Sequence, residues 1–241
     1  MKKLVLGVLT AVLFTIFQPA VNSFADIRSY VWTYEYQTKP KDEIEFEYYL
    51  TTAVPDSGQS NINTWQHWVE AEYGLTDRWD VGLYQMFTQK NTGSSSSLEY
   101  DGFKIETKYR IGEKNQFLLD PLLYFEYIRD DDLSKPNVGE AKLVLAKDIG
   151  RFNLSYNQIV ERNIENKGKT EHEYAAGLNY AFTPLIKFGV ESKGSYTNRE
   201  YAFGPSLSLE ERKFWVSFGA VFGLNDKTDD IQTRMIVGMD F

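Results

Sequence analysis

Only two histidines occur in the 241-residue sequence, and they are the side chains best suited to acid–base or nucleophilic catalysis. A catalytic Ser–His pair needs a third group that holds the imidazole in the correct orientation. His67 is followed by Trp68 and has no Ser or Asn beside it. We therefore expect no catalytic residue and no enzyme activity.

Acidic groups could instead bind cations. His172 stands between Glu171 and Glu173, and the stretches 130–132 and 229–230 are rich in Asp. Such groups could hold Ca²⁺, or lipopolysaccharide through bridging cations. We favour the simpler interpretation, in which they are solvated rim and loop residues. The sequence also lacks a phosphate-binding glycine loop, a nucleotide fingerprint and cysteine ligands, so we expect no metal and no cofactor.

Most of the remaining charge recurs at every second residue, as in Glu45 and Glu47 or in Lys104, Glu106 and Lys108. A period of two places such side chains on one face of a β-strand. Acids outnumber bases on this charged parity. The residues that we expect to line a lumen and to influence solute selectivity are Glu45, Glu47, Glu70, Glu72, Lys104, Glu106, Lys108, Arg110, Glu126, Lys142, Lys187, Glu191 and Arg234.

The opposite parity is apolar. In the last stretch of the chain, Ile231, Val237 and Phe241 share this parity, and only Ile236 breaks the alternation. A soluble sheet would bury such a face in a core, whereas a membrane barrel exposes it to lipid. A charge in the middle of a lipid-facing run would cost roughly 2–4 kcal/mol, and the middles of these runs carry none.

Alternating segments of this kind recur along the chain, and their lengths suit a tilted membrane strand, which needs roughly 9–11 residues. We expect strands near 43–54, 62–75, 79–90, 98–111, 117–130, 138–148, 151–163, 170–182, 185–196, 200–210, 213–224 and 231–241. Tight connections such as 76–78 alternate with longer polar ones such as 130–137. Short turns on one side and longer loops on the other are typical of outer-membrane barrels. The connection 196–199 is an exception, because it is short although it falls on the loop side.

The N-terminus has the features of a secretory signal. Lys2 and Lys3 precede an apolar run over 4–17, and the small residues Ser23 and Ala25 mark a cleavage site. The run is shorter than the roughly 20 residues that a membrane-spanning helix needs. We expect cleavage after Ala25.

The strand count leaves one segment over. Counting back from Phe241, the strand near 43–54 is the first of an even-numbered barrel, so residues 26–42 fall outside the barrel wall. We expect them to lie in the periplasm or to fold into the lumen as a plug; the alternative is an extra strand. The predicted organisation is a signal peptide over 1–25, a periplasmic or plug segment over 26–42 and a transmembrane barrel over 43–241.

The chain ends on a free aromatic, Phe241. In this it resembles the closing strand of Gram-negative outer-membrane β-barrels, whose C-terminal aromatic belongs to the signal read by the barrel-assembly machinery. The turn phrase 73–79, loosely repeated at 180–184, is similar to periplasmic turns of uncharacterised transporter- and porin-like outer-membrane proteins. The resemblance implies an all-β fold, a closed antiparallel transmembrane barrel of twelve strands in the outer membrane. The partners that it implies are outer-membrane lipid, lipopolysaccharide and the assembly machinery.

Composition narrows the function. The chain has 26 Lys and Arg against 34 Asp and Glu, and the signal removes two of the bases, so nucleic acid is disfavoured as a partner. The mean hydropathy of −0.42 is compatible with a barrel, because half of each strand faces a polar interior. Two interpretations of that interior remain open. Either paired charges pack it shut, or water fills part of it and the acidic excess favours cations.

We therefore predict a porin-like channel or transporter for small polar solutes with an acidic, cation-preferring lumen. The alternative is a closed barrel that acts as a structural or surface-interaction protein through its loops. A second alternative, an outer-membrane lipid-modifying enzyme, is disfavoured because His67 departs from the pattern of the outer-membrane phospholipase family.

Overall fold

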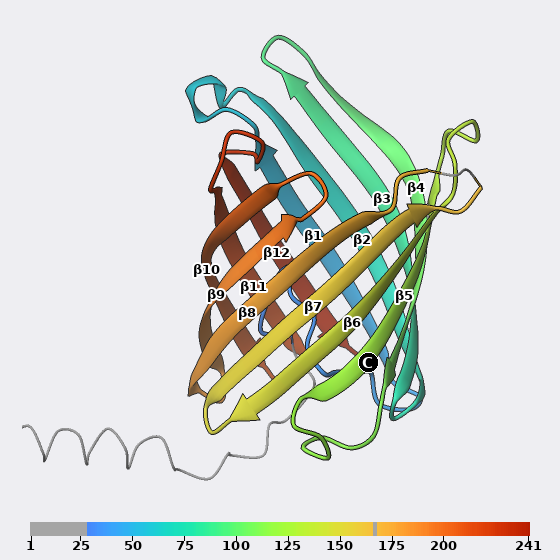
Figure 1. The fold of residues 1–241 in the computed structure, drawn as a ribbon, viewed down its shortest axis with the longest axis vertical. Coiled ribbons are helices and arrows are strands. Elements are labelled where there is room, and N and C mark those ends of the chain that lie inside the picture. The colour runs from blue at the N-terminus through green and yellow to red at the C-terminus, as the bar shows by residue number, and fades with distance from the viewer. Residues whose placement is uncertain (1–27, 166–167) are drawn as a thin grey trace, which may run out of the picture.

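In the computed structural model, which describes residues 28–165 and 168–241, a closed antiparallel barrel forms from twelve strands (Figure 1). The strands are β1 (Ile44–Val54), β2 (Ile62–Thr76), β3 (Trp79–Thr92), β4 (Ser96–Arg110), β5 (Asp120–Asp130), β6 (Val138–Ile149), β7 (Phe152–Asn163), β8 (Glu171–Thr183), β9 (Ile186–Ser195), β10 (Glu200–Glu211), β11 (Phe214–Gly223) and β12 (Ile231–Asp240). This confirms the predicted fold class. The predicted signal peptide lies outside the described residues.

Strand boundaries agree with the predicted ones to within a few residues, with two informative differences. β3 and β4 continue further than expected, so their connection shrinks to residues 93–95. They form a hairpin that rises above the neighbouring strands in Figure 1. β5 begins only at Asp120, because residues 117–119 belong to the preceding turn, where Leu118 is 89% exposed.

The connections alternate in position as well as in length. The turns after β2, β6, β8 and β10 span two residues each and lie at the same end of the barrel as the C-terminus (Figure 1). In outer-membrane barrels the short turns face the periplasm. We therefore call this end the periplasmic end and the other the extracellular end.

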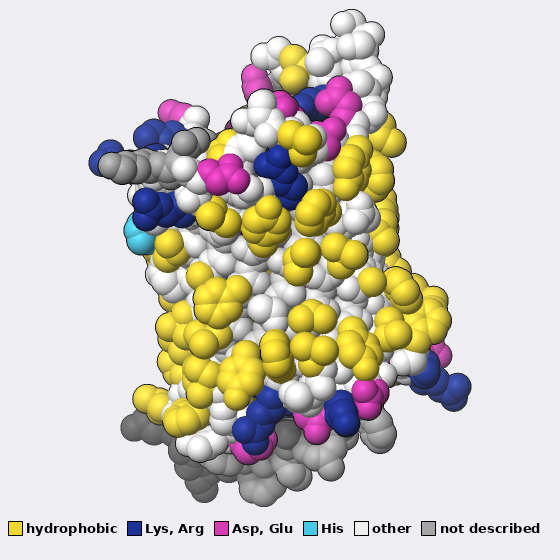
Figure 2. All heavy atoms as spheres, turned by 90° about the vertical axis from the view of Figure 1, so that its right-hand side faces the viewer, with side chains coloured by type: hydrophobic (Ala, Val, Ile, Leu, Met, Phe, Trp, Pro, Cys, Tyr) yellow, Lys and Arg dark blue, Asp and Glu magenta, His cyan; other side chains and the backbone are white. Residues whose placement is uncertain are grey.

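The outer surface is apolar around the barrel. Figure 2 shows hydrophobic side chains spread over the wall, with charged side chains gathered at the two ends. The strand-borne members include Phe46, Ile105, Phe125, Leu154 and Phe218, each close to half exposed. Such a band is what lipid contact requires. Within the described residues, no helix has the length and apolar character needed to cross a membrane.

The last strand closes the barrel. β12 pairs with β1 over ten residue pairs, from Glu45 opposite Asp240 to Val54 opposite Ile231. The Phe241 amide donates to the Ile44 carbonyl, and the Phe241 ring packs edge-on against Phe46 at 5.6 Å on the outer face. Ile236, which interrupts the alternation, points inward and is fully buried in the lumen.

Residues 28–40 lie inside the barrel rather than in its wall, and the blue trace in Figure 1 runs between the strands. Tyr30, Val31 and Trp32 are at most 7% exposed and contact inward-facing side chains of distant strands. The segment meets the wall at the periplasmic end, where the Asp42 amide donates to the Gly74 carbonyl.

Candidate functional site: the barrel lumen

One carboxylate holds the innermost turn of the N-terminal segment. Glu191 projects from the middle of β9 and accepts hydrogen bonds from the backbone amides of Val31, Trp32 and Thr33, each at 2.9 Å. The Thr33 hydroxyl donates to the same carboxylate at 3.0 Å. Glu191 is 1% exposed. A buried charge is tolerable when several donors satisfy it, and here the donors are amides that would otherwise be unpaired.

Neutral polar residues of β7 hold the next part of the segment. The Asn157 side chain accepts from the Tyr34 amide at 2.6 Å and donates to the Tyr34 carbonyl at 2.9 Å. Ser155 also donates to that carbonyl, and the Tyr30 hydroxyl donates to Asn153. These contacts satisfy backbone groups that no sheet ladder reaches, which fixes the path of the segment.

Two inward glycines leave space for the segment. A Cβ at Gly177 would lie 2.4 Å from the Tyr30 ring. A Cβ at Gly219 would lie 2.5 Å from Val31 and 3.0 Å from Trp32. Any larger residue at either position would push the segment off the wall of β8 or β11.

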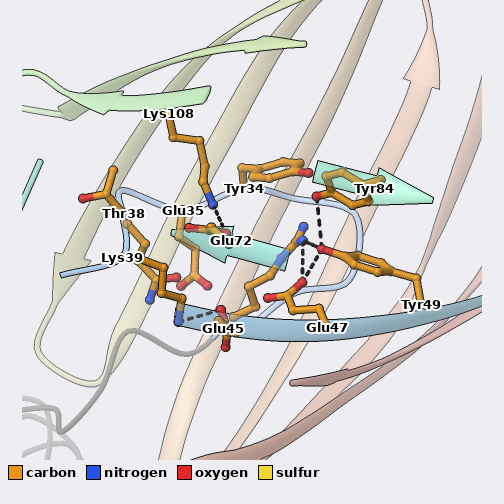
Figure 3. Close-up of a pocket in the computed structure, with 12 residues that line it drawn as sticks. Tyr34, Glu35, Thr38, Lys39, Glu45, Glu47, Tyr49, Glu72, Tyr84 and Lys108 are labelled. Atoms are coloured by element: carbon orange, nitrogen blue, oxygen red, sulfur yellow. Dashed lines mark hydrogen bonds and ion pairs between the residues drawn. The ribbon is translucent and has the colours of Figure 1, made fainter. Parts of the chain in front are cut away.

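Charged side chains of the segment reach the part of the wall that β1 and β12 form (Figure 3). The Lys39 ammonium lies 2.6 Å from a Glu45 oxygen, the contact drawn in Figure 3. It also lies 2.9 Å from an Asp240 oxygen, so it bridges β1 and β12. The Arg28 guanidinium donates to the Tyr49 hydroxyl at 2.7 Å and lies 3.9 Å from Glu47. The segment therefore supplies positive charge to a wall that is rich in carboxylates.

These carboxylates belong to a row that crosses the wall from strand to strand, which we call the carboxylate row. Successive members are directly opposite in the sheet register, with Gly82 standing between the third and the fourth: Asp240, Glu45, Glu72, Glu106, Glu126, Glu140, Glu161 and Glu171. The row begins at the periplasmic end of β12 and finishes at the extracellular end of β8. Like charges directly opposite one another are destabilising, so the row requires compensation.

Lysines on flanking positions supply that compensation. Lys108 lies 2.7 Å from Glu72, Lys104 lies 2.9 Å from Glu126, and Lys142 lies 2.5 Å from Glu140. Tyr84 and Tyr124 donate hydroxyl hydrogen bonds to Glu106 at 2.8 and 2.6 Å. The row is thus paired along most of its length, and the last two members, Glu161 and Glu171, form no ion pair with any described side chain.

The lumen differs between its two halves. Around Lys39, Glu45 and Glu72 the free volume is about 30 Å³. A cavity of about 450 Å³ remains on the extracellular side of Trp32 and Tyr34, and these two side chains line its inner end. The first volume is that of a single water site, whereas the second lies in the range of small-molecule pockets.

The residues that we predicted to line the lumen divide into two groups by the contacts they make. The residues that contact the N-terminal segment are Glu45, Glu47, Arg110, Lys142, Lys187, Glu191 and Arg234. The residues that form ion pairs and hydrogen bonds within the wall are Glu70, Glu72, Lys104, Glu106, Lys108 and Glu126.

Sequence reasoning missed the residues that hold the segment through neutral groups: Asn153, Ser155, Asn157, Ser208 and Ser217. The last two both donate to the Arg28 carbonyl, at 3.0 and 2.7 Å. A signal was present, because the inward parity of β7 changes from charged to small and polar at these positions. Small polar inward residues leave room for another piece of backbone.

The two histidines lie away from the lumen. The His67 Nδ1 is 2.7 Å from the Tyr48 hydroxyl, and the two rings lie side by side at 6.3 Å. Leu50 stands opposite His67 in the sheet. His172 is exposed at the extracellular end of β8. No described serine makes a hydrogen bond with either imidazole ring.

No protein-family model matches the sequence, and no curated protein matches it significantly. Solved structures do resemble the barrel. The COG4313 outer membrane channel from Pseudomonas putida F1 aligns with a TM-score of 0.61 at 9% identity, over 88% of this chain and 100% of the channel. The KdgM porin in complex with disordered oligogalacturonate aligns with a TM-score of 0.53 at 10% identity, over 83% and 98%. Outer membrane phospholipase A from Escherichia coli aligns with a TM-score of 0.47 at 12% identity, over 85% of this chain and 94% of the phospholipase. The chain therefore has the fold of an outer-membrane β-barrel and is similar in architecture to small porin channels.

Proposed function

We propose that this protein is a porin-like channel for small polar solutes in the Gram-negative outer membrane, exported through a cleaved signal over residues 1–25. The observation that carries the proposal is the cavity of about 450 Å³ inside a wall that is apolar outside and charged inside. A barrel whose only task was to fill the membrane would pack its interior from end to end, as eight-stranded barrels do.

Residues 26–42 act as the plug of this channel. The described part of the segment fills the periplasmic half of the lumen and is held through Glu191, Asn157 and Lys39. All of these contacts are hydrogen bonds and ion pairs that water can replace. Passage of a solute then requires the segment to shift or leave, and solutes wait in the extracellular cavity until it does.

The acidic excess of the lumen favours cations over anions. In the plugged state Lys39 and Arg28 neutralise Glu45, Asp240 and Glu47. When the segment leaves, these carboxylates lose their partners and face the water that enters. Cation preference is therefore stronger in the open channel than in the plugged one.

A closed barrel with a structural role is the second candidate. The dense ion pairing of the periplasmic half, where the free volume is about 30 Å³, favours it. An enzyme is the weakest candidate, because no described histidine has the partners of a catalytic pair.

Planar-bilayer recording of the refolded chain tests the proposal. The channel should give discrete conductance steps, and a KCl gradient should give a reversal potential of the sign expected for cations. The same protein without residues 26–42 should conduct more and select cations more strongly. Silence from both forms after verified refolding would favour the closed barrel.

A further inference from the structure

Five charged side chains that line the extracellular cavity have no ion-pair partner among the described residues. They are Glu161, Glu173, Glu200, Lys193 and Arg234. The other charged residues of the same cavity are paired with one another, Lys104 with Glu126 and Lys142 with Glu140. The cavity therefore contains unpaired charge of both signs, which could have been neutralised internally and is not.

The two unpaired bases both lie beside Trp32 of the plug. The Lys193 ammonium and the Arg234 guanidinium lie 5.7 and 5.9 Å from the centre of the Trp32 ring. Their hydrogen-bond acceptors are neutral: Lys193 donates to Gln232 at 2.9 Å, and Arg234 donates to Thr51 and to the Val31 carbonyl at 2.8 and 3.1 Å. Two cations on one aromatic ring, neither of them paired with a carboxylate, form a site that attracts an anionic group.

Two of the unpaired acids, Glu173 and Glu200, lie on the strands beside Lys193 without pairing with it. Lys193 pairs in the sheet with Ala175 on β8 and with Ala202 on β10. Glu173 and Glu200 lie two residues nearer the extracellular ends of those strands, which makes both of them diagonal neighbours of Lys193. Diagonal Cα atoms are roughly 7–8 Å apart, a distance that these long side chains could bridge. They form no ion pair, so space is left between the opposite charges.

A ligand of one sign satisfies only part of this arrangement. A simple anion would be attracted by Lys193 and Arg234 but repelled by three carboxylates. A simple cation would be attracted by the three carboxylates but repelled by the two bases. A solute that carries both charges can neutralise both sets at once. The cavity volume suits a molecule of that kind with a small body, and Trp32 and Trp68 offer apolar surface to it.

We propose that the extracellular cavity binds a small zwitterion with a free carboxylate and a free ammonium group, such as an amino acid or a short peptide. Its carboxylate lies against Lys193 and Arg234, and its ammonium group lies toward Glu161, Glu173 and Glu200. Binding itself needs only the cavity, whereas the idea that this zwitterion is the transported solute rests on the proposed channel function.

Three matched dipeptides test the proposal by calorimetry on the refolded chain in detergent. Alanyl-alanine carries both charges, N-acetyl-alanyl-alanine carries only the carboxylate, and alanyl-alanine amide carries only the ammonium group. We expect the zwitterion to bind at least tenfold more tightly than either blocked form. Equal binding of the acetylated form would overturn the role of the acids, equal binding of the amide would overturn the role of the bases, and no binding would overturn the site.

Paired substitutions separate the two charge sets. Lys193→Gln with Arg234→Gln should lower the affinity for alanyl-alanine to that of the amide, and Glu161→Gln with Glu173→Gln should lower it to that of the acetylated form. Lys90→Gln, on the exposed end of β3, is the matched control and should change nothing. Unchanged affinity in both double variants would refute the assignment of these residues.

Conductance recording keeps this inference distinct from the channel proposal. Conductance without dipeptide binding would overturn the zwitterion site and leave the channel intact. Dipeptide binding without conductance would leave the site intact and overturn the channel.

Discussion

The two halves of the lumen solve the problem of buried charge in different ways. In the periplasmic half, Glu45 and Asp240 both pair with Lys39 of the N-terminal segment, and the free volume around them is about 30 Å³. In the extracellular half, Glu161, Glu173, Lys193 and Arg234 line an open cavity and form no ion pair with one another. A charge out of bulk water must be paired or wet. Lys39 pairs the carboxylates around it in the periplasmic half, whereas five charged side chains around the extracellular cavity have no ion-pair partner among the described residues.

This difference assigns closing of the lumen to one half and recognition of the solute to the other. Ion pairs that involve Lys39 and Arg28 can form and break as the segment moves, because both partners are already charged and polar. The extracellular charges belong to the wall itself, although Arg234 also donates to the Val31 carbonyl of the segment. The plug therefore sets whether the lumen is open, and the wall sets what gathers above it.

The largest effect is expected from deleting residues 26–42. The described part of the segment fills the periplasmic half, so its loss should raise single-channel conductance several-fold. The loss should leave folding of the barrel intact, because the described residues of the segment belong to none of the twelve strands. Heat-modifiable migration on a gel checks folding, and planar bilayers measure conductance. Unchanged conductance would mean that the wall itself closes the periplasmic half.

The sequence predicted the barrel well because alternation is a local property. Each strand, such as Phe214–Gly223, needs only its own residues to show which face is apolar. The inward direction of Glu191 and Arg234 followed from the same count. What those side chains contact did not follow, because it depends on how residues 28–42 fold back through the lumen, and this path is set by contacts more than 100 positions apart.

The carboxylate row shows the same limit. Parity places Glu106, Glu126 and Glu140 on the inner face, but only the register places them directly opposite one another. Register depends on the length of every turn between them. The sequence therefore predicted an acidic lumen and not which acids would be paired.

The second-largest effect is expected from Glu191→Ala. This change leaves the buried amides of Val31, Trp32 and Thr33 without an acceptor, at a cost of about 1–3 kcal/mol for each unsatisfied donor. The segment should undock, and trypsin should then cut after Arg28. Mass spectrometry of the digested barrel measures the cut.

Glu210→Ala is the control for that change, because Glu210 is an inward acid of the same half that makes no hydrogen bond with the described part of the segment. It should leave Arg28 protected. Equal protection in the Glu191→Ala variant would show that Asn157 and Lys39 hold the segment without the help of Glu191.

A smaller effect is expected from Lys39→Met, which removes the cation between Glu45 and Asp240 but keeps most of the side-chain volume. Breaking a buried pair by removing one partner costs about 3–5 kcal/mol, and water that enters from the periplasmic end should reduce this figure. Urea unfolding in lipid vesicles measures the loss. Lys41→Met is the control, because its side chain is 61% exposed; a loss as large as that of Lys39→Met would contradict the bridging role.

The smallest effect concerns the extracellular rim, where pairing is not needed because water is present. The Ser57 amide donates to the Asp230 carboxylate at 2.7 Å, which joins the β1–β2 loop to the start of β12. This hydrogen bond lowers the pKa of Asp230 below its usual value of about 3.9. Because the pKa is lower in the folded protein, the contact stabilises the rim fully above the unfolded value and weakens as the pH falls through the folded one.

Amide hydrogen exchange at Ser57 should therefore lose protection below about pH 4, and Asp230→Asn should flatten this dependence. If protection at Ser57 is the same at all acid pH values, another contact restrains this loop. The contrast between the paired charges of the periplasmic half and the unpaired charges of the extracellular half would then not extend to the loops.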